Sequence, residues 1–241
     1  MTPDLDVLIQ SSTDPILSLE YHRQFTHSLF FIPFGSLIFA ILIFPLFKSS
    51  LSLKTVYFAS FLGYATHGLL DACTSYGTQL FWPFSNERIS WNNISIVDPL
   101  FTIPILIFLV IAIKTKKKTF SFFGIGWIIF YLTLGYVQYE RALSAAIELA
   151  TMRGHNAERL TLKPSFGNLI LWKSIYQHKE TFYVDAIRTV QSSTWCSGDT
   201  IRVFDYKYHL PDLDKNSQQK KDIERFRWFS QDYFCLLYTS D

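Results

Sequence analysis

Two groups of histidine and aspartate residues in this chain have the types and spacing to bind a divalent metal ion. His67 and Asp71 are four residues apart, so on a helix their side chains would project from the same face. His22 and His27 are five residues apart, which fits a loop or a helix start better than one helical face. Neutral imidazole and carboxylate together suit Zn²⁺, Mn²⁺ or Fe²⁺. We therefore expect a divalent ion here, zinc before manganese or iron.

Three further carboxylates accompany these residues. Asp4 and Asp6 lie in the segment PDLD, and Asp98 lies in SIVDPLF. Each has a structural alternative: Asp4 and Asp6 could be turn residues or a helix cap, and Asp98 before Pro99 is a good helix start. The carboxylates alone therefore do not decide between a role as metal ligand and a role as turn residue or helix cap.

The histidines also have alternative interpretations. His67 could be a hydrogen-bonded packing residue inside an apolar stretch. His22 and His27 could be interfacial residues at the membrane surface. An ionisable residue at membrane depth is costly, however, and is by default a functional hypothesis. Convergence favours the metal site, because independent packing residues need not gather on one face of the membrane.

Four apolar blocks must position these side chains. They are Leu29–Phe47, Thr55–Leu70, Pro99–Ile113 and Phe120–Tyr139. A transmembrane helix needs roughly 20 apolar residues, so the first and fourth blocks suffice alone and the other two need flanking residues or a thinner bilayer. The chain is thus predicted to be a polytopic α-helical membrane protein with about four transmembrane helices. The alternative is that the short blocks are buried helices of a soluble core.

Lysines between the blocks predict the orientation. Two lie between the first and second blocks, and four lie between the third and fourth: Lys48, Lys54, Lys114, Lys116, Lys117 and Lys118. Both loops fall on one side, which should be cytoplasmic because short cytoplasmic loops are rich in Lys and Arg. The segment before Leu29, the loop Asp71–Asp98 and everything after Tyr139 would then face outward, with the histidines and aspartates near the outer membrane face.

The C-terminal part reads as a soluble, extracytoplasmic domain. Residues 1–139 would form the transmembrane helical domain with the metal site, and residues 140–234 a mixed β-rich domain. β-branched and aromatic residues predict strands in RLTLKPSF, NLILWKSIYQH, TFYVDAIRTV and TIRVFDYKY, and DIERFRWFSQD has helical spacing. Residues 235–241, CLLYTSD, look like translated sequencing-adapter sequence. The net charge of +2 does not suggest nucleic-acid binding.

The motifs together resemble those of the bacterial inner-membrane, membrane-bound metal-dependent hydrolases. The resemblance rests on PDLD, HRQFTHS, HGLLDACTSYGTQLFWPFS and SIVDPLF, and extends over about residues 3–234. It implies hydrolysis at a His/Asp metal site, here His22, His27, His67, Asp71 and Asp98, with Asp4 and Asp6 as further candidates. Asp98 would act as ligand or general base. Family members usually carry one more apolar helix before PDLD, so a fifth span is expected in the natural protein.

The leading functional hypothesis is therefore a metal-dependent hydrolase at the outer face of the bacterial inner membrane. Its location suggests an amphiphilic substrate such as a lipid or phosphoester, with membrane lipid as a partner. The alternative is a non-catalytic membrane scaffold or assembly protein whose outer domain binds a partner. A transporter or proton relay is disfavoured, because the charged residues lie near one end of the spans and not near the midplane.

Overall fold

The computed structural model describes residues 2–235, which form two compact units. One unit joins residues 2–90 to residues 204–235, and the other contains residues 91–203. Of the suspected adapter sequence at 235–241, all but Cys235 lies outside the described residues. The compact units do not divide the chain at residue 139, because one unbroken helix runs through that position.

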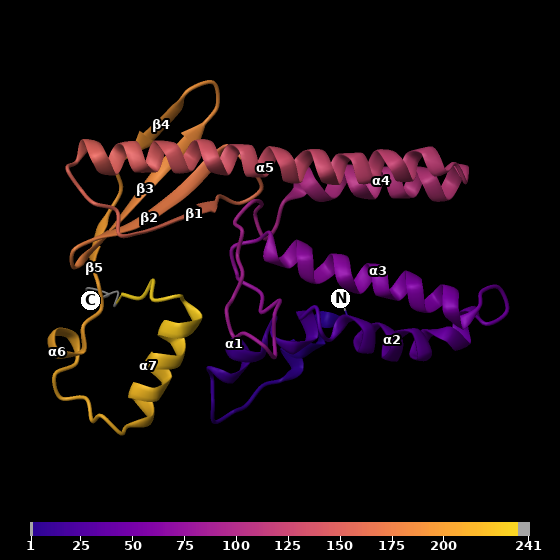
Figure 1. Ribbon diagram of the computed structural model, residues 1–241, viewed down its shortest axis with the longest axis horizontal. Helices are drawn as coiled ribbons and strands as arrows, with labels where there is room; N and C mark the ends of the chain where they lie inside the picture. The colour runs from indigo at the N-terminus through magenta and orange to yellow at the C-terminus, as the bar shows by residue number, and fades with distance from the viewer. Residues whose placement is uncertain (1, 236–241) are drawn as a thin grey trace. The chain divides into compact units, whose positions relative to one another are not determined.

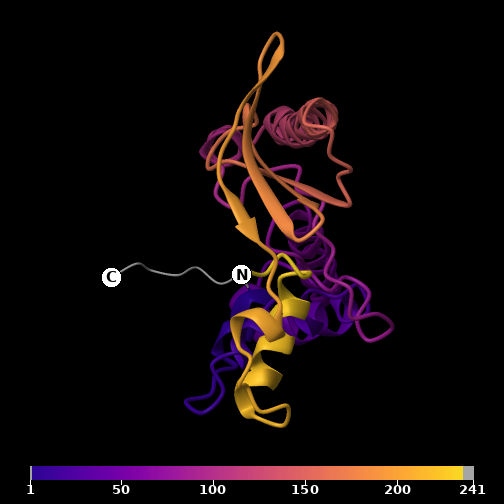
Figure 2. The same ribbon diagram turned by 90° about the vertical axis from the view of Figure 1, so that its left-hand side faces the viewer.

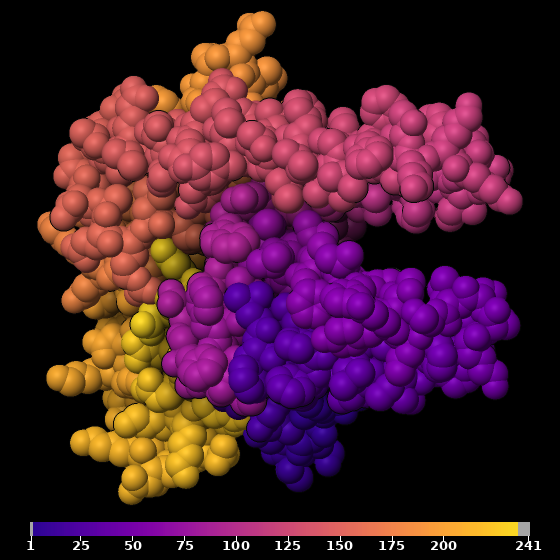
Figure 3. Space-filling view, turned by 45° about the vertical axis from the view of Figure 1, so that its right-hand side comes forward, coloured from indigo at the N-terminus to yellow at the C-terminus, as the bar shows by residue number. Residues whose placement is uncertain are grey.

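Helices make up the first unit. Its elements are the 3₁₀ helices Pro3–Leu8 (η1) and Phe25–His27 (η2), and the α-helices Leu17–Tyr21 (α1), Ile32–Phe47 (α2), Leu53–Ala72 (α3), Tyr206–His209 (α6) and Gln218–Phe229 (α7). α2 and α3 lie side by side as a hairpin (Figures 1 and 3). Gly35 of α2 permits this close packing, because a Cβ atom there would come within 2.7 Å of the Tyr64 ring.

The C-terminal helix α7 is joined to the N-terminal segment by one arginine. The Arg225 guanidinium donates to Asp14 at 2.9 Å and to Glu20 at 2.6 Å. These charge-assisted bonds are stronger than neutral ones. They explain why residues more than 200 positions apart in the sequence belong to one unit.

The second unit combines two antiparallel helices with a sheet. α4 spans Pro99–Thr115 and α5 spans Lys118–Met152, and the strands are Arg159–Pro164 (β1), Leu171–His178 (β2), Thr181–Thr189 (β3), Ser193–Cys196 (β4) and Thr200–Arg202 (β5). The first half of α5 packs on α4, where Trp127 Nε1 donates to the Phe101 carbonyl at 3.3 Å. The second half lies across one face of the sheet, as the end-on view of α5 shows (Figure 2).

The sheet is antiparallel throughout, with strand order β1-β2-β3-β4 and β5 also paired to β3. The prediction of a helical N-terminal half followed by a β-rich domain is therefore confirmed. One predicted strand is shorter than expected: TIRVFDYKY is extended only over Thr200–Arg202. Asp205 ends the extended segment because its side chain accepts from Lys207 N and caps α6.

Among the described residues, one helix, α5, is long and apolar enough to cross a bilayer by itself. Residues 17–27 and 32–47 meet the same test only together, and they are bent by 85°. α4 is apolar but has 17 residues. The outward faces of these helices carry many exposed apolar side chains, among them Ile38, Leu42, Leu46, Ile107, Val110, Ile113, Phe122 and Ile129. Apolar patches of this extent are typical of surfaces that face lipid or protein.

The contact between α5 and the sheet yields a stability prediction. Trp172 is fully buried in the cluster formed by Ala142, Ala146 and Ile187. Trp172→Ala should lower the free energy of unfolding of this unit by about 3–5 kcal/mol, because it removes a large side chain from a packed core. Phe166→Ala is the control, since Phe166 is 73% exposed. Urea titration followed by limited proteolysis measures both, and equal effects would contradict the assignment of this core.

Candidate metal centre

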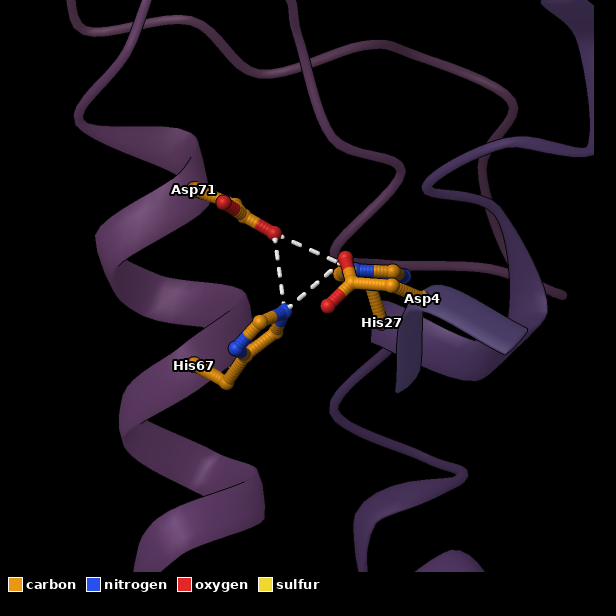
Figure 4. A group of neighbouring side chains, drawn as sticks. All are labelled: Asp4, His27, His67 and Asp71. Atoms are coloured by element: carbon orange, nitrogen blue, oxygen red, sulfur yellow. Dashed lines mark hydrogen bonds and ion pairs between the residues drawn. The ribbon is translucent and has the colours of Figure 1, made fainter. Parts of the chain in front are cut away.

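Four donor side chains of the first unit converge on one point (Figure 4). They are Asp4, His27, His67 and Asp71, and their donor atoms all lie within 4.8 Å of one another. His27 Nε2 lies 3.1 Å from Asp71 Oδ2 and 3.5 Å from Asp4 Oδ1. His67 Nε2 lies 3.2 Å from Asp4 Oδ1 and 3.4 Å from Asp71 Oδ2. The arrangement alternates nitrogen and oxygen around a small central space.

These separations match those around a single ion. Zinc bonds to imidazole nitrogen and carboxylate oxygen are about 2.0–2.2 Å, so ligands at the corners of a tetrahedron lie about 3.3–3.6 Å apart. The four nitrogen–oxygen separations are 3.1–3.5 Å. The side chains could therefore hold a divalent ion with small adjustments of rotamer.

The local structure explains how each donor reaches this point. His67 and Asp71 lie one turn apart on α3 and point the same way, as their spacing predicts. Asp4 comes from η1, whose short 3₁₀ turn begins at Pro3. His27 ends η2, and four residues lie between it and the start of α2 at Ile32. Helix α3 thus supplies two donors, and the irregular N-terminal segment supplies the other two.

Asp6 organises the N-terminal half of the site. Its carboxylate is buried and accepts from Arg23 N at 2.9 Å and Thr26 Oγ1 at 2.7 Å. His22 Nδ1 lies 2.8 Å from its other oxygen. Burial alone would raise the pKa of Asp6, but hydrogen bonds from His22, His27 and Thr26 outweigh it and hold this pKa far below its usual value. Asp6 is therefore an ionised acceptor that fixes the loop.

This network sets the tautomer of His27. The Thr26 hydroxyl gives its single proton to Asp6, so its oxygen must accept from His27 Nδ1, 2.9 Å away. Asp6 Oδ2 also lies 3.3 Å from the same nitrogen. With the proton on Nδ1, the lone pair of Nε2 points toward Asp4 and Asp71. A metal-binding histidine commonly gives its other N–H to a carboxylate in this way.

Two buried atoms of the group lack a hydrogen-bond partner within the described residues: His27 Nε2 and Asp71 Oδ2. They lie 3.1 Å apart, yet their geometry is not that of a hydrogen bond. Buried polar atoms are normally satisfied. A cation between them would satisfy both, so the residues present fit a metal ion.

Gly68 allows α3 to approach His27. A Cβ atom at Gly68 would come within 2.7 Å of the His27 carbonyl oxygen. Because that neighbour is backbone, it could not move aside without displacing η2. The glycine next to His67 is thus required for the two histidines to face one ion.

Arg23 borders the group on its other side. Its Nη2 lies 3.2 Å from Asp71 Oδ1, and its Nη1 donates to Thr74 Oγ1 at 2.9 Å. Asp71 therefore directs Oδ2 toward the four-donor group and Oδ1 toward the guanidinium of Arg23. The backbone of Arg23 has φ = 61°, a left-handed conformation that is uncommon for a residue with a side chain. The hydrogen bond that the Arg23 backbone N–H donates to Asp6 Oδ2 stabilises this turn.

The predicted site residues are thus distributed in three ways. Asp4, His27, His67 and Asp71 meet, while His22 and Asp6 form a hydrogen-bonded pair beside them. Asp98 lies in the second unit, where its Oδ1 caps α4 and its Oδ2 accepts from Tyr131 at 2.8 Å. Its role as ligand or general base stays a prediction.

Sequence reasoning did not single out Gly68, Tyr76 or Arg88. Arg88 is buried and donates to the carbonyls of His22 and Gly77, both at 2.9 Å. Its position in a loop gave no periodic signal. Gly68 could have been noticed as the smallest residue between two candidate ligands, His67 and Asp71.

The exposed apolar side chains of the helices and the His/Asp group near the end of α3 are the features of a membrane protein with a candidate metal centre. Residues 1–142 match the model of the YdjM inner membrane protein family, and the chain belongs to that family. It is therefore an inner membrane protein, as the sequence motifs predict.

One relative extends the comparison. The chain is 28% identical over 97 residues to the "uncharacterized protein YfhP" of Bacillus subtilis (strain 168). The matched stretch covers 40% of this chain and 29% of that protein. No solved structure matches the chain.

The close approach at Gly68 yields a prediction on metal affinity. Gly68→Ala should weaken binding of Zn²⁺ by about tenfold or more, because the added methyl group displaces His27 from α3. Alanine is the better helix former by about 1 kcal/mol, so the helix itself should not lose stability. Competition with a fluorescent zinc chelator measures the affinity.

Gly63→Ala provides the matched control on the same helix, since a Cβ atom there meets nothing within 4 Å. It should bind Zn²⁺ as the unchanged protein does. Equal affinities of the two variants would show that the contact with His27 does not shape the site.

Proposed function

We propose that this protein is a membrane-bound metal-dependent hydrolase whose ion is held by Asp4, His27, His67 and Asp71. The observation that carries the proposal is the set of nitrogen–oxygen separations of 3.1–3.5 Å around one point. The contacts of His27 Nδ1 with Thr26 and Asp6 support it, because they direct Nε2 toward the other three donors, as in metal-binding histidines. Two imidazoles and two carboxylates favour zinc, and manganese or iron would accept the same donors.

The proposed topology has four spans, α2, α3, α4 and α5, with the metal site and the sheet outside the cytoplasm. The lysines at the turn between α2 and α3 and at the turn between α4 and α5, in the connections and the adjoining helix ends, support this orientation. α2 and α4 have 16 and 17 residues, close to the lower limit of a spanning helix. Modest local thinning of the bilayer accommodates such lengths.

A divalent ion at this site would polarise a carbonyl or phosphoryl oxygen of a substrate and make water more acidic. Among the donors, the Asp4 side chain is the most exposed, at 37%, and that of His27 is fully buried. Substrate would therefore approach from the side of Asp4. His27 and the Asp6 network behind it keep the opposite side closed to water.

An amphiphilic substrate fits the surroundings. A groove of about 460 Å³ lies between α2 and α3, lined by apolar residues such as Phe39, Ile43 and Val56. Pro3, the neighbour of Asp4, lies at this groove. A substrate with an alkyl chain could place the chain in the groove and its polar group near Asp4.

One observation favours the alternative of a non-catalytic scaffold. Four protein ligands would complete a tetrahedral zinc site, and structural zinc sites are closed in this way whereas catalytic sites keep a position open. In that case the ion would brace α3 against the N-terminal segment. Hydrolysis instead requires a coordination position for water or substrate. This position exists if the ion takes five or six ligands, or if substrate displaces Asp4 from the ion.

Activity measurements separate the two functions. With Zn²⁺ or Mn²⁺ bound, the detergent-purified protein should hydrolyse p-nitrophenyl phosphate or a p-nitrophenyl ester. Asp71→Ala should lower kcat/KM at least about 100-fold, since even residues behind the ligands typically contribute 10–100-fold. Asp212→Ala is the control, because Asp212 is exposed in the C-terminal segment.

Two results would contradict the proposed hydrolase function. One is activity that survives both chelation and Asp71→Ala. The other is a tightly bound ion without turnover of any ester or phosphoester, which would assign the site to the scaffold.

A further inference from the structure

Two buried arginines belong to the same unit as the candidate metal centre: Arg23 contacts its Asp71, and Arg88 donates to the carbonyl of the adjacent His22. Arg23 is 9% exposed and Arg88 is 4% exposed. Burial of a guanidinium ion away from water is strongly unfavourable unless anions and hydrogen bonds compensate for the lost hydration. Their partners therefore show whether the two charges are compensated within the chain.

Arg88 is incompletely paired. Its Nη2 donates to the carbonyls of His22 and Gly77, both at 2.9 Å. Its Nε and Nη1, which carry three N–H bonds between them, have no partner within residues 2–235, and no carboxylate there pairs with it. A buried arginine held by two carbonyls still lacks a counter-charge.

Arg23 is better paired but retains one free donor. Its Nη2 faces Asp71, and its Nη1 donates to Thr74. Its Nε is buried and has no partner in the described part of the chain. Because Asp71 also belongs to the four-donor group, this guanidinium lies directly beside the candidate ion.

Both arginines lie against the same aromatic ring. The Arg23 guanidinium carbon is 5.0 Å from the centre of the Tyr76 ring, and that of Arg88 is 5.5 Å from it. Burial lowers the pKa of Arg88 to about 10, and the nearby charge of Arg23 acts in the same direction. Two buried guanidinium groups thus share one aromatic neighbour, and an anion that accepts from their unpaired donors would compensate both positive charges.

The segment that links the arginines contains further unsatisfied groups. Gly77 O accepts from Arg88, and Gln79 N donates to the Arg23 carbonyl at 2.9 Å. The Thr78 hydroxyl and both polar atoms of the Gln79 side chain are buried without a partner among the described residues. Unsatisfied buried groups are rare, and here they accompany the two arginines.

We propose that Arg23 and Arg88 form an anion subsite that binds the phosphate group of the substrate beside the metal ion. The inference rests on the proposed hydrolase function and narrows its substrate class to phosphoesters. Arginine is suited to this task because guanidinium donors match phosphate oxygens and stay charged at every physiological pH. Carboxylic esters lack the charge that these donors would compensate.

Inorganic phosphate is the probe, and its binding is measured by equilibrium dialysis of the detergent-purified full chain with radiolabelled phosphate. Dialysis in a chelator tests the arginines without the ion, and metal content is measured separately. The unchanged protein should bind one phosphate per chain in the chelator. Arg88→Gln should weaken phosphate binding at least about tenfold, the value of one charge-assisted hydrogen bond, while it still binds the metal.

Arg202→Gln is the control, because Arg202 pairs with Glu180 on the surface at 2.9 Å. It should bind phosphate as the unchanged protein does. Arg88 also donates hydrogen bonds to the carbonyls of His22 and Gly77, so its replacement by glutamine could unfold the loops that contain these two residues. Arg88→Lys therefore serves as a second variant: it keeps the charge but has three N–H donors, so the two carbonyls leave one for an anion where Arg88 has three, and weaker phosphate binding is expected.

The inference is overturned if the unchanged protein binds no phosphate, or if Arg88→Lys and Arg88→Gln bind it as tightly as the unchanged protein. If the unchanged protein binds metal but no phosphate, only the proposed anion subsite is rejected. If it binds phosphate but no metal, only the proposed metal-dependent hydrolase function is rejected. Competition by phosphatidate in mixed micelles identifies the source of the phosphate. Stronger competition than by free phosphate indicates a lipid, and equal competition indicates a soluble phosphoester; both support the subsite.

Discussion

The buried carboxylate of Asp6 is the constraint on which the candidate site depends. It gathers donors from His22, Arg23 and Thr26 into one network, and through Thr26 it orients His27. A buried carboxylate would be destabilising alone, but several hydrogen bonds to its ionised form outweigh the loss of solvation. The irregular segment between η1 and α2 is thereby held in a defined shape without a long helix or a strand. Asp4 and His27 reach α3 only because this segment is fixed.

Helix α3 provides the rigid half of the arrangement. Its one-turn spacing presents His67 and Asp71 together, and Gly68 lets the His27 backbone come close. Asp71 links the candidate metal centre to Arg23, since its Oδ2 faces His27 of the four-donor group and its Oδ1 faces the Arg23 guanidinium. A substrate phosphate would lie between a metal ion and two arginines, where its negative charge is compensated from both sides. This combination is the physical basis for placing phosphoester hydrolysis ahead of ester hydrolysis.

Much of this organisation could be predicted from the sequence, for identifiable reasons. The pair His67 and Asp71 follows from helical periodicity, and the strands β1, β2 and β3 follow from β-branched and aromatic enrichment. The different roles of Asp4 and Asp6 could not be predicted, because two residues in a 3₁₀ turn differ only by what lies opposite each of them. Arg88 was equally invisible, since its importance arises from contacts across 66 residues of sequence. Tertiary contacts of irregular segments leave no pattern in the order of the residues.

In the proposed metal centre, Asp4, His27, His67 and Asp71 together hold one divalent ion. The decisive measurement is the metal content of the purified protein, determined by inductively coupled plasma mass spectrometry after loosely bound metal has been removed. We expect one zinc, manganese or iron ion per chain, and less than about a tenth of that in His67→Ala and in His27→Ala. A His155→Ala control, changed in the sheet-bearing unit, should keep its metal. No bound metal in the unchanged protein, or full occupancy in both ligand variants, would show that these four residues do not form a metal centre.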